Sequence, residues 1–148
     1  MKAFVFRLER LLKLRARKER ERARALGDAV KDELARRAAL ERESEKLGQV
    51  EAQVAERGKV ATAGMRVAMG LAVEAAAQRR DAAETSHRAA AEQVNEEKQR
   101  FGQARMERRV VERLRERRED AWRVDVSREE QVEHDRLATH RAHESRRK

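Results

Sequence analysis

The segment GKVATAGMRVAMG, residues 58–70, decides how this chain folds. It contains Gly58, Gly64 and Gly70, three of the six glycines in the 148-residue sequence. Glycine relaxes the backbone limits that keep a helix regular, and Thr62 is suited to cap the start of a new helix. Because long stretches of strong helix formers flank this segment, we place a turn here between two helices.

Upstream of the turn, apolar residues recur at every seventh position. The stripe reads Val5, Leu12, Glu19, Leu26, Glu33, Leu40, Leu47 and Val54, with two glutamates as interruptions. A seven-residue repeat is typical of a coiled-coil helix. Apart from Ala29, the companion positions between Leu8 and Val50 are charged, so the expected contact between helices is sparse.

Downstream of the turn, a second helical pattern continues nearly to the C-terminus. Folding the chain about a midpoint near residue 61 brings together the richest apolar patches of the two arms, namely Leu8, Leu11 and Leu12 with Leu114, Val111 and Val110. The sequence therefore predicts an all-α fold, a long antiparallel two-helix coiled coil (a helical hairpin) with a C-terminal helical overhang. We expect a single coiled-coil domain over residues 1–148, with helix 1 at about 3–57, the turn at about 58–66 and helix 2 at about 67–143.

Composition excludes several other classes of protein. Charged residues make up 44% of the chain and aromatic residues 3%, which is too little apolar material for a wide globular core. The chain has no cysteine, which rules out disulfides and thiolate metal sites and fits a reducing cytosol. Its longest apolar run, 67–73, ends at Glu74 and is too short to span a bilayer.

No residue pattern indicates catalysis, a cofactor or a metal. His140 and His143 have a spacing that suits metal binding on a helix, but no cysteine or motif carboxylate accompanies them, so surface histidines are the favoured interpretation. Gly58 and Lys59 superficially resemble a phosphate-binding loop, yet the first glycine and the final Ser/Thr of that motif are missing. We predict a non-enzymatic protein without a cofactor or small-molecule substrate.

The formal net charge of +9 raises the possibility of nucleic-acid binding. In stretches such as ERLRERREDAWR, residues 112–123, arginines alternate with acids, and aromatic residues for stacking on bases are nearly absent, so nucleic acid is not the expected partner. The basic excess of the first thirty residues suits an acidic protein surface or anionic lipid. A nucleic-acid-binding coiled coil, and a structural dimer whose sparse seam a second chain completes, remain as alternatives.

Both ends of the chain resemble one known family. The opening FVFRLERLLKLRARKERERARALG, residues 4–27, resembles the start of flagellar FliJ proteins, where an F-x-F-x-L-x-x-(L/V)-L-x-(L/Y)-(R/K) pattern precedes a charged helix. Residues 108–141 are similar to the family's C-terminal arm, with an ERL-x-E-(R/K)-R stretch, although His134 and Arg136 depart from its trailing acidic pattern. Between about residues 55 and 90 the chain matches the family only in type.

The resemblance implies a cytoplasmic component of bacterial flagellar protein export, peripherally associated with the inner face of the membrane at the flagellar base. It would act as a central-stalk-like rod that binds the hexameric export ATPase, couples the ATPase ring to the membrane export gate and helps recycle export chaperones. By position, the residues expected to face the ATPase are Phe4, Phe6, Leu8, Arg10, Leu11, Arg113, Arg117 and Trp122. Gate contacts are expected near the turn. Trp122 has two open readings from the sequence alone, as a cap on the apolar seam or as a protein-binding anchor.

Overall fold

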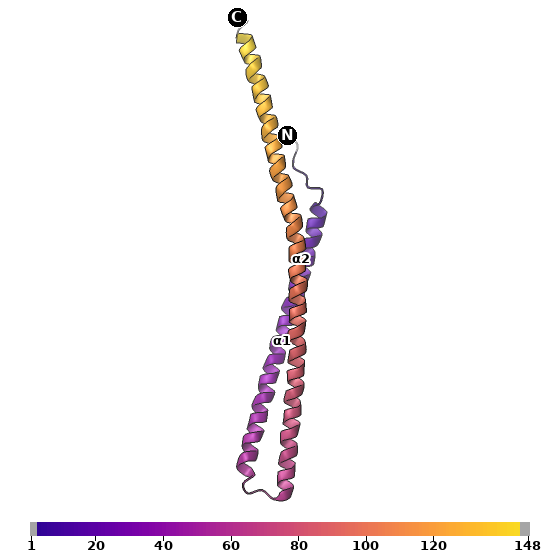
Figure 1. Ribbon diagram of the computed structural model, residues 1–148, viewed down its shortest axis with the longest axis vertical. Coiled ribbons are helices and arrows are strands. Elements are labelled where there is room, and N and C mark those ends of the chain that lie inside the picture. The colour runs from indigo at the N-terminus through magenta and orange to yellow at the C-terminus, as the bar shows by residue number, and fades with distance from the viewer. Residues whose placement is uncertain (1–2, 146–148) are drawn as a thin grey trace. The chain divides into compact units, whose positions relative to one another are not determined.

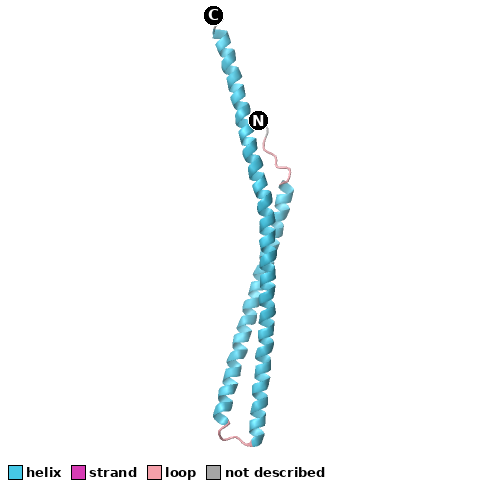
Figure 2. Ribbon diagram, in the orientation of Figure 1, coloured by secondary structure: helices cyan, strands magenta, loops and turns pink. Residues whose placement is uncertain are grey.

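The computed structural model describes residues 3–145, with side chains through residue 140. Two helices account for nearly all of this range, α1 at Glu9–Arg57 and α2 at Ala63–Ser145, joined by one short turn (Figure 1). Figure 2 shows helix and loop throughout the described residues, with no strand. The predicted all-α, antiparallel two-helix coiled coil is confirmed.

The helix boundaries differ from expectation at two points. Helix α1 begins at Glu9 rather than near residue 3. Residues 3–6 have no regular secondary structure, residues 7–8 form a turn, and the Phe6 carbonyl oxygen accepts the Glu9 N–H at 3.1 Å. Helix α2 begins at Ala63 rather than near residue 67. Its cap is Thr62, whose hydroxyl accepts the Met65 N–H at 3.4 Å and whose carbonyl oxygen accepts the Arg66 N–H at 3.0 Å.

The turn depends on one of its glycines more than on the others. The Gly58 N–H donates to the Val54 carbonyl oxygen at 2.8 Å, and a Cβ added to Gly58 would lie only 2.7 Å from that oxygen. Any other residue at this position would need the backbone to shift. A Cβ on Gly64 or Gly70 would meet open space, so these two glycines lie inside α2 without a packing requirement.

The chain divides into two compact units. Residues 1–19 and 104–148 form the terminal unit, and residues 20–103 form the turn unit. Each unit contains a piece of α1 packed against a piece of α2. That the whole chain folds as one domain stays a prediction.

Small side chains fill the contact between the helices of the turn unit. Ala29 of α1 and Ala76, Ala90 and Val94 of α2 are buried. Because these side chains are short, they let the two backbones approach but remove little apolar area from water. Glu97 is buried in the same contact, with its Oε1 accepting a hydrogen bond from Arg100 at 2.5 Å.

The charged interruptions of the upstream stripe have partners across the helix contact. Glu33 Oε1 lies 2.8 Å from His87 Nε2, and Glu19 forms an ion pair with Arg108. From Leu12 to Val54 every stripe residue is half-buried, whereas Val5 lies before the helix and is exposed. The midpoints of both pairs fall within three residues of position 61, in agreement with the expected register.

Candidate functional site

Residues 3–6 of the terminal unit precede α1 without regular secondary structure, and Phe4 among them packs on α2. Phe6 is 7% exposed, and Phe4 lies against Trp122 with ring centroids 5.9 Å apart at an interplanar angle of 48°. A tilted arrangement at this distance is favourable for two aromatic rings. The two phenylalanines therefore close the start of α1 onto α2 instead of extending the helix.

Ion pairs across the helices hold the rest of the terminal unit in register. Arg15 pairs with Glu107, and Lys18 Nζ lies 3.6 Å from the same carboxylate. Closer to the N-terminus, Arg115 lies 3.8 Å from Glu9. These contacts are partly exposed, so each contributes about 0–1 kcal/mol and is weakened by salt.

Arg108 is the most engaged of these cations. It pairs with Glu19 of α1 and, at 2.7 Å, with Glu112 on its own helix. The hydrogen bond that the Arg108 guanidinium donates to the Glu19 carboxylate, supported by the nearby charge of Glu112, raises the pKa of Arg108 above its ordinary value. The guanidinium is thereby held between a carboxylate of α1 and one of α2.

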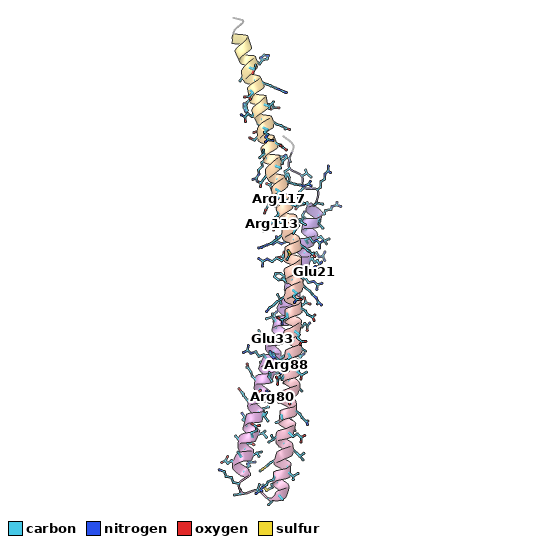
Figure 3. The ribbon with its side chains drawn as sticks, in the orientation of Figure 1. Glu21, Glu33, Arg80, Arg88, Arg113 and Arg117 are labelled. Atoms are coloured by element: carbon cyan, nitrogen blue, oxygen red, sulfur yellow. The ribbon has the colours of Figure 1, made fainter. Side chains whose placement is uncertain are left out.

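The terminal unit contains all eight residues that the sequence pointed to as the ATPase-facing group. Phe6 is buried, while Phe4, Leu11 and Trp122 are half-buried in the helix contact. The exposed members are Leu8, Arg10, Arg113 and Arg117, the last two of which are labelled in Figure 3.

The exposed arginines of this group differ from those at the helix contact. Within the described part of the chain, Arg10, Arg113 and Arg117 take part in no ion pair, whereas Arg15, Arg108 and Arg115 all do. Cations held inward stabilise the contact between α1 and α2. Cations turned outward keep their charge available to a partner.

One expected apolar contact is wrong. Val110 was expected opposite Leu12 in the helix contact, but it is 64% exposed on the outer side of α2. Leu8 and Leu114, which were also expected in that contact, are 38% and 36% exposed. Val111 takes the inner position and is half-buried. The reason is helical phase. Ala104, Arg108 and Val111 lie along the side of α2 that faces α1, and Val110, one residue before Val111, is rotated about 100° away from that side.

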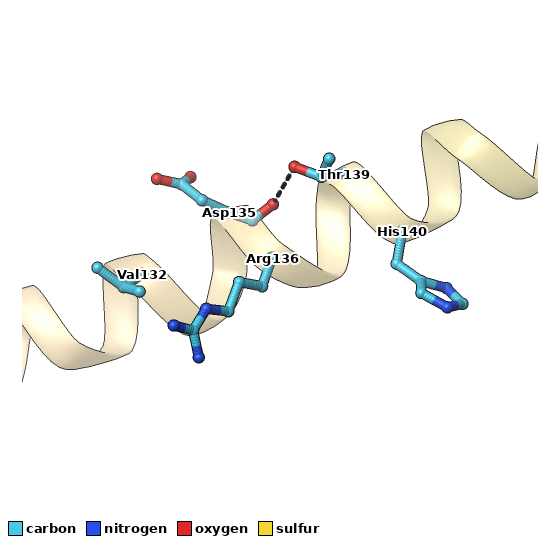
Figure 4. A pocket seen from close by; sticks show the side chains of 5 residues that line it. All are labelled: Val132, Asp135, Arg136, Thr139 and His140. Atoms are coloured by element: carbon cyan, nitrogen blue, oxygen red, sulfur yellow. Dashed lines mark hydrogen bonds between the residues drawn. The ribbon is translucent and has the colours of Figure 1, made fainter.

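The described part of the chain has two surface hollows large enough to admit small molecules. One lies near the turn, lined by Val50, Gln53, Val54, Arg57, Ala68, Met69 and Ala72. The other, on α2, is lined in the described residues by Val132, Asp135, Arg136, Thr139 and His140 (Figure 4).

Neither hollow has the convergent polar groups of a ligand site. In Figure 4 all five side chains project from a single helix, and the hydrogen bond drawn is from the Thr139 hydroxyl to the Asp135 carbonyl oxygen at 2.7 Å. Among the residues described, no three His, Cys, Asp or Glu side chains gather into a metal-binding group. His143 lies beyond the side chains that the structure describes.

Two further properties complete the description. Within residues 3–145, no helix is long and apolar enough to cross a bilayer. Over residues 127–139 every side chain of α2 is exposed, so none of them is buried against another element among the described residues. This stretch is the predicted helical overhang.

An antiparallel pair of long helices with a thin core defines a coiled-coil protein. The chain belongs to the family of flagellar FliJ proteins, whose sequence pattern it matches over residues 4–147. This membership makes it a coiled-coil protein of flagellar export. No curated protein and no solved structure matches the chain.

Sequence reasoning missed the extended N-terminal segment and most of the ion pairs between helices. The F-x-F spacing was a usable signal for the first, because alternating aromatic residues suit an extended chain better than a helix. The ion pairs had a signal as well, since Glu19 and Glu33 interrupt an otherwise apolar stripe. A charge at such a position needs a partner on the facing helix.

Proposed function

We propose that this protein is a non-enzymatic, central-stalk-like component of the flagellar export apparatus. Its terminal unit binds the ring of the hexameric export ATPase, and the segment near its turn contacts the membrane export gate. Through these two contacts it couples the ATPase to the gate and assists the recycling of export chaperones. The protein acts in the cytoplasm, peripherally associated with the inner face of the membrane at the flagellar base.

The observation that carries this proposal is the separation of inward and outward arginines in the terminal unit. Arg108 and Arg115 are engaged with carboxylates of α1, while Arg10, Arg113 and Arg117 project without an ion pair in the described residues. Arginine next to aromatic side chains is the composition of energetic centres in protein interfaces. An ATPase surface that supplies carboxylates would therefore find a preformed set of partners here.

The aromatic contact at the end of α1 supports the same assignment. The Phe4 and Trp122 rings pack together at 5.9 Å and are only half-buried, so part of each ring still faces outward. A rigid, partly exposed aromatic pair loses little conformational entropy on binding. Trp122 can therefore both cap the apolar seam and anchor a partner protein, because one face of its ring packs internally and the other face is accessible.

The turn unit has a different surface near the turn. Val60 is 89% exposed, and Met65, Val67 and Leu71 are also largely exposed, with few charges among them. Exposed apolar residues in a cluster mark a surface that binds another protein. We assign this surface to the contact with the export gate.

The test is binding to the cognate export ATPase, measured by co-sedimentation and by stimulation of ATP hydrolysis. The variant Arg113→Glu/Arg117→Glu should bind at least about 30-fold more weakly, which corresponds to a loss of about 2 kcal/mol at an interface centre. The matched control is Arg24→Glu/Lys31→Glu, which makes the same charge change at exposed positions in the turn unit. It should bind like the wild-type protein.

Two results would contradict the proposal. The first is an intact wild-type protein that neither binds the ATPase nor changes its rate of hydrolysis. The second is equal weakening by both double variants, which would mean that net charge rather than this surface governs the association.

A further inference from the structure

A second line of apolar residues runs along α2 in the terminal unit, away from α1. It consists of Met106, Val110, Leu114, Ala121, Val124 and Val132. Successive members are three, four, seven or eight residues apart, so all six fall on one side of the helix. We call this line the outer stripe.

The outer stripe has no partner among the described residues. Met106, Val110, Val124 and Val132 each keep half or more of their accessible surface exposed. The stripe extends over 27 residues of helix, or about 40 Å at 1.5 Å per residue. Its length and spacing are those of a coiled-coil seam, interrupted at the stripe positions Arg117 and Arg128.

Charge divides the same part of α2 into two opposite halves. Residues 104–118, the basic half, contain seven arginines and three acids, for a net charge of +4. Residues 119–140, the acidic half, contain three arginines and seven acids, for a net charge of −4. The boundary between the halves falls near the middle of the outer stripe.

We propose that the outer stripe is the contact with a second copy of this chain, bound antiparallel about a two-fold axis near residue 120. In this arrangement the basic half of each copy lies beside the acidic half of the other, and the two apolar stripes pack between them. The contact is isologous, so each favourable charge relation occurs twice. A parallel pair would instead place like halves together, which is unfavourable.

Other binding partners are complementary in charge to only part of the outer stripe and its flanking residues. An acidic helix of another protein would be attracted by the basic half and repelled by the acidic half. An anionic lipid surface faces the same conflict, because seven carboxylates lie within residues 119–140. A second copy is complementary along the full length, since the two net charges are equal and opposite.

The proposed dimer also gives the C-terminal overhang of α2 a second helix to pack against. Every side chain from Ser127 to His140 is exposed in the single chain, so this stretch buries no apolar area of its own. Pairing covers Val132 and places the acidic half of α2 against arginines. The segment then has tertiary packing, on which most helical stability in proteins depends.

Dimerisation and the proposed ATPase contact use the same arginines. Arg113 and Arg117 flank or interrupt the outer stripe and also belong to the ATPase-facing group, so one contact excludes the other. This competition rests on the proposed function, whereas the dimer itself does not. The chain would be stored as a dimer and would bind the ring as a single copy.

Charge reversal tests the antiparallel arrangement without any other protein. In Arg109→Glu/Arg113→Glu/Arg118→Glu the basic half changes from +4 to −2, so both halves are acidic. In the reciprocal variant Asp125→Lys/Glu129→Lys/Asp135→Lys, the acidic half changes from −4 to +2 and both halves are basic.

Each variant alone should be monomeric by sedimentation equilibrium, because like halves now meet. An equimolar mixture should form a one-to-one heterodimer that dissociates as salt is raised. All six substituted residues are exposed, so far-ultraviolet circular dichroism should show that helix content is retained.

A second pair of variants tests the apolar part of the contact. Val110→Ser/Val124→Ser should weaken dimerisation at least about tenfold, since two exposed valines leave the seam. The matched control is Leu137→Ser, which removes an equally exposed apolar side chain that lies off the outer stripe. It should dimerise like the wild-type chain.

Several outcomes would overturn the proposal. These are a wild-type chain that stays monomeric up to about 1 mM, a dimer that survives either charge reversal, and a mixture of the two variants that fails to associate. A monomer that instead binds anionic vesicles or an acidic helical peptide through Val110 would assign the stripe to another occupant. None of these measurements contains the ATPase, so the proposed function can fail or hold independently.

Discussion

Replacing the buried Glu97 with leucine should stabilise this protein. The Glu97 side chain is 9% exposed, and its Oε2 is buried without a hydrogen-bond partner in the described structure. Its cationic neighbours are Arg100, at 2.5 Å, and Arg22, at 3.9 Å from α1. A carboxylate in this position loses most of its hydration and recovers only part of it through these two contacts.

The expected gain follows from the exposure of the two arginines. Their side chains are 41% and 53% exposed, so Glu97→Leu leaves both cations in water rather than as unpaired buried charges. Burying a leucine contributes about 1.5–3 kcal/mol, and removing the carboxylate relieves a desolvation cost of several kcal/mol, against about 1.5–3 kcal/mol for the lost charged hydrogen bond. We expect a net increase of about 1–4 kcal/mol in the free energy of unfolding.

Urea denaturation followed by far-ultraviolet circular dichroism measures this change. The control is Glu96→Leu, the same substitution one residue earlier at an exposed position, which should change the free energy of unfolding by less than about 0.5 kcal/mol. If Glu97→Leu lowers the stability while the control does not, the ion pairs outweigh the desolvation cost and the reasoning is refuted. A lower slope of the unfolding free energy against urea would indicate that the polar group had been fixing the helix register.

Three further changes have definite expected outcomes. Gly58→Ala should lower the unfolding free energy by about 1–2 kcal/mol in urea denaturation, because its Cβ would lie 2.7 Å from a backbone carbonyl oxygen of the preceding turn. Phe6→Ala should release the N-terminal segment at a cost of up to about 3 kcal/mol, and the emission of Trp122, the only tryptophan, should shift to longer wavelength as the ring becomes exposed. The hydrogen bond from Lys46, 2.7 Å long, lowers the pKa of Glu43, so Lys46→Met should move that pKa upward in a proton NMR titration. The stabilising part of this pair is present above the unfolded-state pKa and is lost as the pH falls through the lowered one, so an unchanged titration would contradict the assignment.

The thin contact between α1 and α2 has a physical consequence for regulation. Its buried residues are mainly alanines, which contribute little apolar area, and partly exposed ion pairs supply much of the specificity. Such a contact is sensitive to salt and to partners that compete for the same charges.

Much of the fold was predictable because helix periodicity is a local property. The glycine-containing segment located the turn, and the seven-residue stripe located α1 and its register against α2. The ion pairs Glu33 with His87 and Arg15 with Glu107 fall where folding about residue 61 puts them. The eight candidate residues also proved to share one unit, since the two ends of a hairpin must meet.

Helical phase was harder to predict than helix existence. Val110 and Val111 are chemically equivalent in the sequence, yet one is exposed and the other faces α1. A rotation of about 100° separates the two positions, and sparse apolar residues do not determine that rotation locally. It is set by which side chains of α1 are long enough or charged enough to reach across.

From the amino-acid sequence alone came the two helices, the turn between them and the family, because each depends on residues close together in the chain. Only the tertiary structure decided that Phe4 and Phe6 leave the helix to pack on α2, and that the arginines of the terminal unit divide into inward and outward sets. The physical reason is that both outcomes depend on the distance between groups about a hundred residues apart in the chain. A charged residue has the same neighbours in the sequence whether or not an opposite charge lies across from it in the fold.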